Sequence, residues 1–179
     1  DIGFARDTAA VSAVYNNRDW GQVVRYDHRI WEPPVHIPDV TDAVERFYRT
    51  QRVGGIYYDP YQWVGEVQRL VKNNPGIEYV LHEVNQQSRM TEISNNLATM
   101  IQRQEFIFYS DPQIRGQYTW CNAESTERGF RIVKKKQTRP IDIVVADAMA
   151  VWGAAHDYSA QSMPGYEEAE HEIPLEEVV

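Results

Sequence analysis

One acidic residue stands where a short apolar run ends and a proline follows. Ile56 to Tyr58 are β-branched and aromatic residues, which predict a buried strand. Pro60 cannot extend a central strand, but it suits the first turn of a helix. We therefore expect Asp59 at the carboxyl end of a strand, which is the edge of an open α/β sheet where ligands bind. The alternative is that Asp59 only caps a helix over residues 61–73.

Two further acids are expected at the ends of elements. Asp1 precedes a turn that contains Gly3, and Asp142 falls in the first turn of the last predicted helix, where the helix dipole favours an acid in any case. Three converging carboxylates would offer the hard oxygen ligands that suit Mg²⁺ or Mn²⁺. Two such ions about 4 Å apart can activate a water and stabilise the leaving oxygen in phosphodiester cleavage. The spacing of the acids permits such a site without requiring one.

A cluster of basic residues precedes the last predicted helix. Six of the twelve residues from 128 to 139 are Lys or Arg, and none is acidic. Such a segment is either a solvated loop or a clamp that holds the phosphate backbone of DNA next to Asp142. This basic cluster consists of Arg128, Arg131, Lys134, Lys135, Lys136 and Arg139.

Several familiar catalytic patterns are absent from the sequence. It has neither the P-loop signature nor the Gly-x-Ser-x-Gly turn of serine hydrolases, and no two histidines lie four residues apart. The five histidines (28, 36, 82, 156 and 171) are scattered, so we expect structural or surface roles for them. The single cysteine, Cys121, excludes an internal disulfide and a cysteine-rich metal site, which fits a reducing compartment. We expect it in a helix, as a core residue.

Length and composition indicate one domain with a sizeable core. The chain has 179 residues, of which 42% are hydrophobic, and no apolar run long enough to span a membrane. No basic segment leads into an apolar one at the N-terminus, so we expect no signal peptide. Residues 165–179 hold six glutamates and no Lys or Arg, and without them the net charge would be about −2 instead of −8. The overall acidity therefore does not argue against a nucleic-acid partner.

Hydrophobic periodicity and turn residues predict a strand hairpin followed by alternating helices and strands. This order predicts one α/β domain with a mixed sheet over residues 1–160. Residues 161–179 have the acidic composition of a flexible tail. The expected strands are 8–15, 22–31, 56–58, 77–84, 105–109 and 130–133. The expected helices begin at Asp39 or Thr41, at 61, at Ser88 or Thr91, at Asp111-Pro112 and at Ile141, and they end near 51, 73, 104, 123 and 156.

Taken in order, these motifs resemble the C-terminal nuclease domain of phage terminase large subunits, the DNA-packaging motors, and in particular the HK97-like group. Two pieces are fairly specific in this order and at this separation. They are Asp-Pro-Tyr-Gln-Trp at 59–63 and Ile-Asp-x-x-x-Ala-x-Ala-Met-Ala at 141–150. The other matching pieces are Asp-x-Gly-x-x-x-Asp-x-x-Ala at 1–10, Gln86 with the helix over 94–101, Tyr-Ser-Asp-Pro at 109–112 and Arg-Gly-Phe-Arg-Ile-Val-Lys at 128–134.

The resemblance implies an RNase H-like fold, with a mixed sheet flanked by helices on both faces. It implies a metal-dependent DNA endonuclease in which Asp1, Asp59 and Asp142 hold Mg²⁺ or Mn²⁺, with two ions expected. Asp147 lies five residues beyond Asp142, not squarely on the same helix face, and is the reserve candidate for the third ligand. The implied substrate is concatemeric double-stranded viral DNA. The implied partners are a terminase ATPase domain, a small terminase subunit and a portal in the host cytoplasm, with no membrane partner.

Two rival interpretations remain open on the sequence alone. A junction resolvase or transposase core would use the same fold and the same metal chemistry. A strict need for branched DNA would favour a resolvase, whereas cleavage of plain linear duplex would favour a terminase. A non-catalytic docking module would instead use the acidic tail to bind a portal or another motor subunit.

Overall fold

The computed structural model describes four stretches of the chain between Thr8 and His156. They are residues 8–17, 19–61, 63–109 and 111–156. Asp1 and the predicted acidic tail lie outside these stretches. No helix within them is long and apolar enough to cross a membrane.

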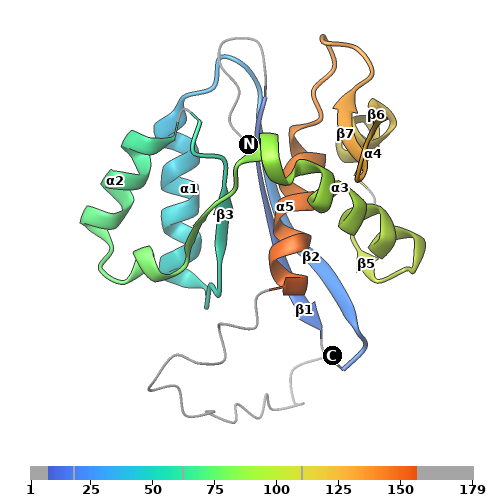
Figure 1. Ribbon diagram of the computed structural model, residues 1–179. Helices are drawn as coiled ribbons and strands as arrows, with labels where there is room; N and C mark the ends of the chain where they lie inside the picture. Colours follow the sequence, from blue (N-terminus) through green and yellow to red (C-terminus); the bar gives the residue numbers. More distant parts are fainter. Residues whose placement is uncertain (1–7, 18, 62, 110, 157–179) are drawn as a thin grey trace, which may run out of the picture.

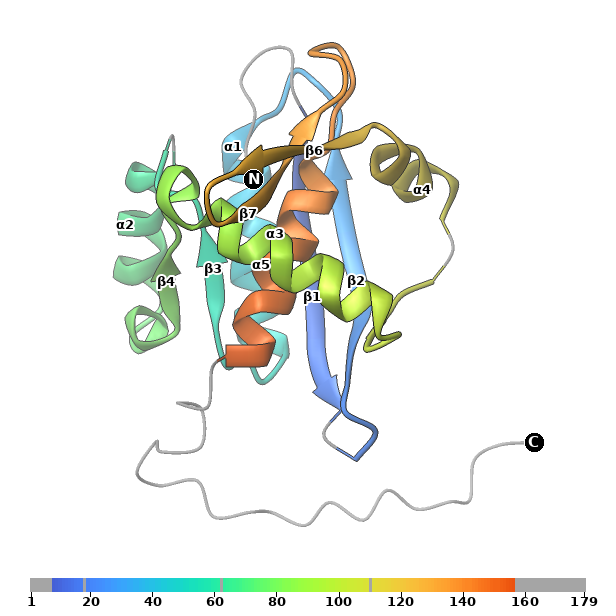
Figure 2. The ribbon, with the colours of Figure 1, turned by 45° about the vertical axis from the view of Figure 1, so that its right-hand side comes forward.

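Most of the strands lie between two layers of helices. In Figure 1, α1 (Ile37–Thr50) and α2 (Val64–Asn73) lie on one side of the strands, and α5 (Asp142–His156) lies on the other. Figure 2 shows α3 (Gln86–Gln102) crossing α5, against which it packs. Helices therefore cover both faces, as the resemblance to terminase nucleases implies.

The described strands form one three-stranded mixed sheet and two separate pairs. β1 (Ala9–Asn17) and β2 (Gln22–Trp31) form the antiparallel hairpin that the sequence predicts, and β5 (Phe106–Ile107) joins β2 in parallel. β3 (Ile56–Tyr58) pairs in parallel with β4 (Leu81–Glu83). The expectation of a mixed sheet is thus confirmed, although β1 and β3 belong to different sheets.

A second hairpin, formed by β6 (Cys121–Thr126) and β7 (Gly129–Lys134), packs across α3. Its turn requires a glycine, because Gly129 has a φ of 131° and a Cβ there would clash with the side chain of Asn95. The backbone N–H of Ile132 also donates a hydrogen bond of 3.0 Å to the hydroxyl of Ser94. These contacts fix the hairpin on the helix layer that includes α5.

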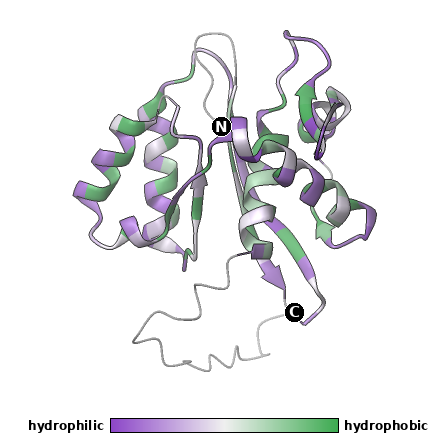
Figure 3. Cartoon of the chain, in the orientation of Figure 1, coloured by the Kyte–Doolittle hydropathy of each residue, from purple (hydrophilic) through white to green (hydrophobic). Residues whose placement is uncertain are grey.

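Two apolar cores lie on opposite faces of β1. Ala10 packs into the core that α3 and α5 dominate, whereas Val11, the next residue, packs against the core of α1, α2 and β3. A strand that is covered on both faces requires this alternation. In α5 every residue from Asp142 to Met149 is buried. By contrast, α1 and α2 alternate between purple and green in Figure 3, as amphipathic surface helices do.

Two predicted elements differ in type from those observed. The strand predicted over 77–84 is confirmed only at Leu81–Glu83, which form β4, because Ile77–Tyr79 form a 3-10 helix, η1. The helix predicted to run to 123 is α4 (Pro112–Thr119), so Cys121 lies in β6 and not in a helix. The residues of β6 are extended because they pair along their whole length with β7.

Three helix starts also differ from the prediction, since α2 begins at Val64 and not at 61. α1 begins at Ile37, before both predicted capping residues, with His36 at the N-cap position. α3 begins at Gln86, because the side chain of Asn85 accepts hydrogen bonds from the backbone N–H groups of Gln87 and Ser88.

Candidate active site

Asp59 directly follows β3, as the sequence predicts. α2 begins only at Val64, with Trp63 at its N-cap position and no hydrogen bond from a capping side chain. Instead, Oδ1 of Asp59 accepts a hydrogen bond of 3.0 Å from the backbone N–H of Tyr61 and so closes a tight local turn. The interpretation of Asp59 as the cap of this helix is therefore wrong. Its half-buried carboxylate is held at the end of the strand.

Asp142 is the first residue of α5, where the sequence predicts it, and its side chain is turned toward β1. Thr8, which immediately precedes β1, donates a short hydrogen bond from its hydroxyl to Oδ2 of Asp142, across 134 residues of chain. Both residues are only 3% exposed. A hydroxyl that donates to a carboxylate in such a buried place forms one of the stronger types of hydrogen bond.

The two described acids lie at one end of the molecule, which we call the acid end. In Figure 1, β3 ends and α5 begins at the upper end, and the segment between β7 and α5 rises there too. Asp1, the third predicted acid, lies outside the described residues. Within the described stretches, no group of three His, Cys, Asp or Glu side chains could hold a metal ion. Asp59 and Asp142 therefore do not complete a metal site by themselves.

Asp147 lies at the centre of a buried polar network. Its Oδ2 atom lies 2.6 Å from the Arg25 guanidinium and accepts a hydrogen bond of 2.9 Å from the Tyr118 hydroxyl. Its Oδ1 atom accepts one of 2.6 Å from the Ser12 hydroxyl. Burial raises the pKa of Asp147, and Arg25 opposes this shift more strongly than the two hydroxyls do. These partners favour a structural role for Asp147 over the reserve role of metal ligand.

The partners of Asp147 are themselves tightly enclosed. Arg25 is 2% exposed, and its guanidinium lies 4.8 Å from the ring centroid of Phe108. Burial, and after it the charge of Asp147, raises the pKa of Tyr118 well above its ordinary value. Although five residues apart on α5, Asp142 and Asp147 both reach hydroxyls of the β1 segment.

The basic cluster is partly engaged within the molecule. Arg131 pairs at 2.9 Å with Glu124, the residue opposite it in the hairpin. Lys135 donates a hydrogen bond of 2.8 Å to the backbone carbonyl of Thr119. The Arg139 guanidinium lies 4.8 Å from the ring centroid of Trp120. The cluster is thus not merely a solvated loop, yet the cations of Arg131, Lys135 and Arg139 remain exposed.

An apolar groove of about 390 Å³ lies between β1 and β3 and reaches Asp59. α1 lines it with Val40 and Val44, and α5 lines it with residues that include Met149 and Gly153. The ring of Tyr57 lies directly against Gly153, where a Cβ would clash with it. Through this contact, β3, which leads to Asp59, packs against α5, which begins at Asp142.

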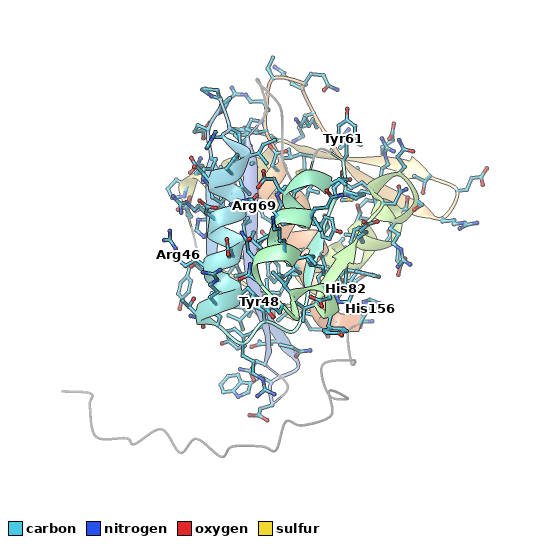
Figure 4. All side chains as sticks on the ribbon, turned by 90° about the vertical axis from the view of Figure 1, so that its left-hand side faces the viewer. Arg46, Tyr48, Tyr61, Arg69, His82 and His156 are labelled. Carbon is cyan, nitrogen blue, oxygen red and sulfur yellow. The ribbon has the colours of Figure 1, made fainter. Side chains whose placement is uncertain are left out.

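Two of the histidines lie away from the acid end. His82 stacks on Tyr57 with ring centroids 4.9 Å apart, and His156 stacks on Trp152 at 5.2 Å. Figure 4 shows both histidines near the lower end of the molecule and Tyr61 near the upper end. Tyr61 is 73% exposed, so an aromatic ring stands on the surface two residues after Asp59.

Sequence reasoning missed Thr8, Ser12 and Arg25, which hold the acids of α5. Thr8 stands at an unspecified position of the motif at 1–10 and Ser12 lies beyond it, but both alternate with Ala10 along one face of a predicted strand. Arg25 offered a clearer signal, because it follows Val23 and Val24 in a predicted strand, and a cation that is buried there needs an anionic partner. That partner is Asp147.

Comparison with known proteins finds similarity in structure. No family model and no curated protein matches the sequence. The crystal structure of the large terminase nuclease from thermophilic phage G20c aligns with a TM-score of 0.62 and 16% identity, over 84% of this chain and 77% of that one. The fold is that of large terminase nucleases.

Two further crystal structures agree with this assignment. The G20c large terminase nuclease with bound magnesium aligns with a TM-score of 0.62 and 18% identity, over 85% of this chain and 77% of that one. The HK97 bacteriophage large terminase aligns with a TM-score of 0.67 and 15% identity, over 84% of this chain and 37% of that one. The chain thus spans little more than a third of the HK97 protein. The expected resemblance is confirmed at the level of the fold, from which function does not follow directly.

Proposed function

We propose that this chain is the metal-dependent endonuclease domain of a viral terminase large subunit, with an RNase H-like fold, and that it cleaves concatemeric double-stranded DNA during packaging. One observation carries the proposal. In a fold that matches large terminase nucleases, Asp59 and Asp142 come from different elements and lie at the same end of the molecule. The proposed nuclease domain covers residues 1–160, and residues 161–179 form its acidic tail.

The carboxylates at the acid end are suitable ligands for a divalent cation. Carboxylate oxygens are the ligands that Mg²⁺ and Mn²⁺ prefer. Asp59 and Asp142 together with Asp1 would hold the metal, with two ions expected, and the G20c large terminase nuclease, which shares this fold, has been crystallised with bound magnesium. When bound, such ions activate water and stabilise the leaving oxygen of a phosphodiester. The protein orients the ligands, because the turn at Tyr61 fixes one oxygen of Asp59.

The basic cluster would hold the DNA. Its segment between β7 and α5 rises at the acid end, so a duplex gripped there would lie across Asp59 and Asp142. The contacts of Lys135 and Arg139 with Thr119 and Trp120 would keep these side chains ordered for phosphate binding. Backbone contacts carry little sequence information, so we expect low sequence specificity.

The proposal also implies partners and a location for this domain. An ATPase domain, a small terminase subunit and a portal would be its partners in the host cytoplasm. The chain itself has no P-loop signature, so ATP hydrolysis would come from that other domain.

Replacing Asp59 by Asn tests the proposal, because it removes a charge and changes almost no volume. We expect loss of Mn²⁺-dependent nicking of supercoiled plasmid, with a melting temperature close to that of the wild type. Asp19→Asn is the matched control, since Asp19 is exposed in the β1–β2 turn at the opposite end. Nicking by Asp59→Asn at the wild-type rate would contradict the site. Cleavage of branched DNA alone would favour a resolvase, and no cleavage by the wild type would favour a docking module.

A further inference from the structure

One face of the β1 segment is directed at α5. Thr8, Ala10 and Ser12 alternate along the chain, and side chains at this spacing lie on the same face of a strand. Thr8 donates to Asp142, Ala10 packs in the core with residues of α5, and Ser12 donates to Asp147. The strand therefore holds the helix through two polar contacts with an apolar contact between them.

The two polar contacts differ in what surrounds the carboxylate. Ser12 is one of three donors on Asp147, whose charge Arg25 already compensates. Thr8 donates to a carboxylate at the first residue of the helix, at the acid end. A hydroxyl bound to Oδ2 restricts rotation of the Asp142 carboxyl group about its last torsion angle, which is otherwise broad.

We propose that Thr8 is a positioning residue for Asp142: its hydroxyl sets the orientation in which this carboxylate meets a divalent cation. The inference rests on the proposed function, since it gives Asp142 a metal to bind. Residues that hydrogen-bond to metal ligands fix their orientation, and their loss typically lowers metal affinity by about 10- to 100-fold. Thr8 does not touch the metal or the DNA in this proposal and acts only through Asp142.

The burial of Thr8 makes the hydroxyl separable from the rest of the side chain. Thr8 is 3% exposed, so its methyl group contributes to packing whatever the hydroxyl does. Thr8→Val keeps the shape and removes the donor, whereas Thr8→Ser keeps the donor and removes the methyl group. A merely structural role predicts that both variants lose stability and that neither changes metal binding specifically.

The experiment measures Mn²⁺ binding to the full 179-residue chain by calorimetry, together with plasmid nicking over a range of Mn²⁺ concentrations. We expect Thr8→Val to weaken Mn²⁺ binding by about 10- to 100-fold and to recover nicking at high Mn²⁺. Thr8→Ser should bind Mn²⁺ like the wild type. Ser12→Ala is the matched control. It removes the hydroxyl that makes the next polar contact along β1, to Asp147, and should leave Mn²⁺ binding unchanged.

Each other outcome has a defined meaning. Wild-type Mn²⁺ affinity in Thr8→Val, or equal weakening in Thr8→Ser and Thr8→Val, would overturn the positioning role. If Thr8→Val does not fold, Thr8→Ala is compared with Thr8→Ser in the same way, and equal affinities would again overturn it. Asp59→Asn separates the two proposals: if it binds Mn²⁺ like the wild type, the metal site itself is wrong, whereas a failure confined to Thr8 leaves that site standing.

Discussion

Asp142 and Asp147 lie on the same buried helix, yet their surroundings differ. Asp147 shares its two oxygens among Arg25, Tyr118 and Ser12, so its charge is compensated inside the protein. Asp142 accepts a hydroxyl group at the start of the helix, where the dipole also favours an anion. The difference teaches that two acids of one motif can be told apart by their partners, and not by their place in the sequence.

The largest expected effect comes from breaking the compensation of Asp147. Arg25→Met should lower the free energy of unfolding by about 3–5 kcal/mol, because it leaves a buried carboxylate without its cation. Urea unfolding followed by circular dichroism measures this loss. Arg69→Met is the matched control: Arg69 pairs with Asp42 and Glu66 on the surface, where ion pairs contribute about 0–1 kcal/mol. Equal losses in the two variants would mean that the buried pair of Arg25 and Asp147 contributes no more to stability than a surface pair.

A smaller effect on stability is expected at Asp142. Asp142→Asn should lower the free energy of unfolding by about 1–2 kcal/mol, because asparagine keeps an oxygen that can accept the Thr8 hydroxyl but replaces a charged acceptor by a neutral one. Asp147→Asn should cost several times more, because it leaves Arg25 buried without an anion. Unfolding in EDTA compares the two variants without any contribution from metal. A larger loss in Asp142→Asn would mean that the structural acid and the candidate ligand have been assigned the wrong way round.

The smallest effect concerns a thiol near the Asp147 network. Burial raises the pKa of Cys121 to about 11, and Lys135 only partly opposes this shift. Because the thiolate is the reactive form, a thiol reagent should react slowly at pH 8, and its rate should rise with pH until about 11. The measured rate profile of the native protein checks this. A plateau near the ordinary value of 9.0 would show that water reaches this side of the network.

Local signals account for the parts of the fold that the sequence predicts well. The β1–β2 hairpin follows from two β-prone runs around a turn, and β3 follows from Ile56 to Tyr58 with Pro60 after it. The start of α5 at Asp142 follows from helical periodicity after Pro140. Two of the three candidate acids could therefore be assigned to element ends from sequence alone.

The remaining features depend on contacts between distant segments. β6 has the polar sequence Cys-Asn-Ala-Glu-Ser-Thr, and it is extended because β7 pairs with it over α3. η1 follows Gly76, whose φ of 95° lets the chain turn where the apolar run alone suggests a strand. The hydrogen bond from Thr8 to Asp142 spans 134 residues and has no local signal at all.

The contact between Tyr57 and Gly153 has a consequence for the distance between the two acids. Within the described residues, β3, which leads to Asp59, and β1, which packs against α5, share no hydrogen-bonded ladder. The position of β3 relative to α5 therefore depends on side-chain packing, and a ring packed closely on a helix backbone resists sliding because packed interiors are not continuously deformable. The separation of the two carboxylates is thus sensitive to the size of one residue, because any side chain at position 153 would have to displace Tyr57 and the strand that leads to Asp59.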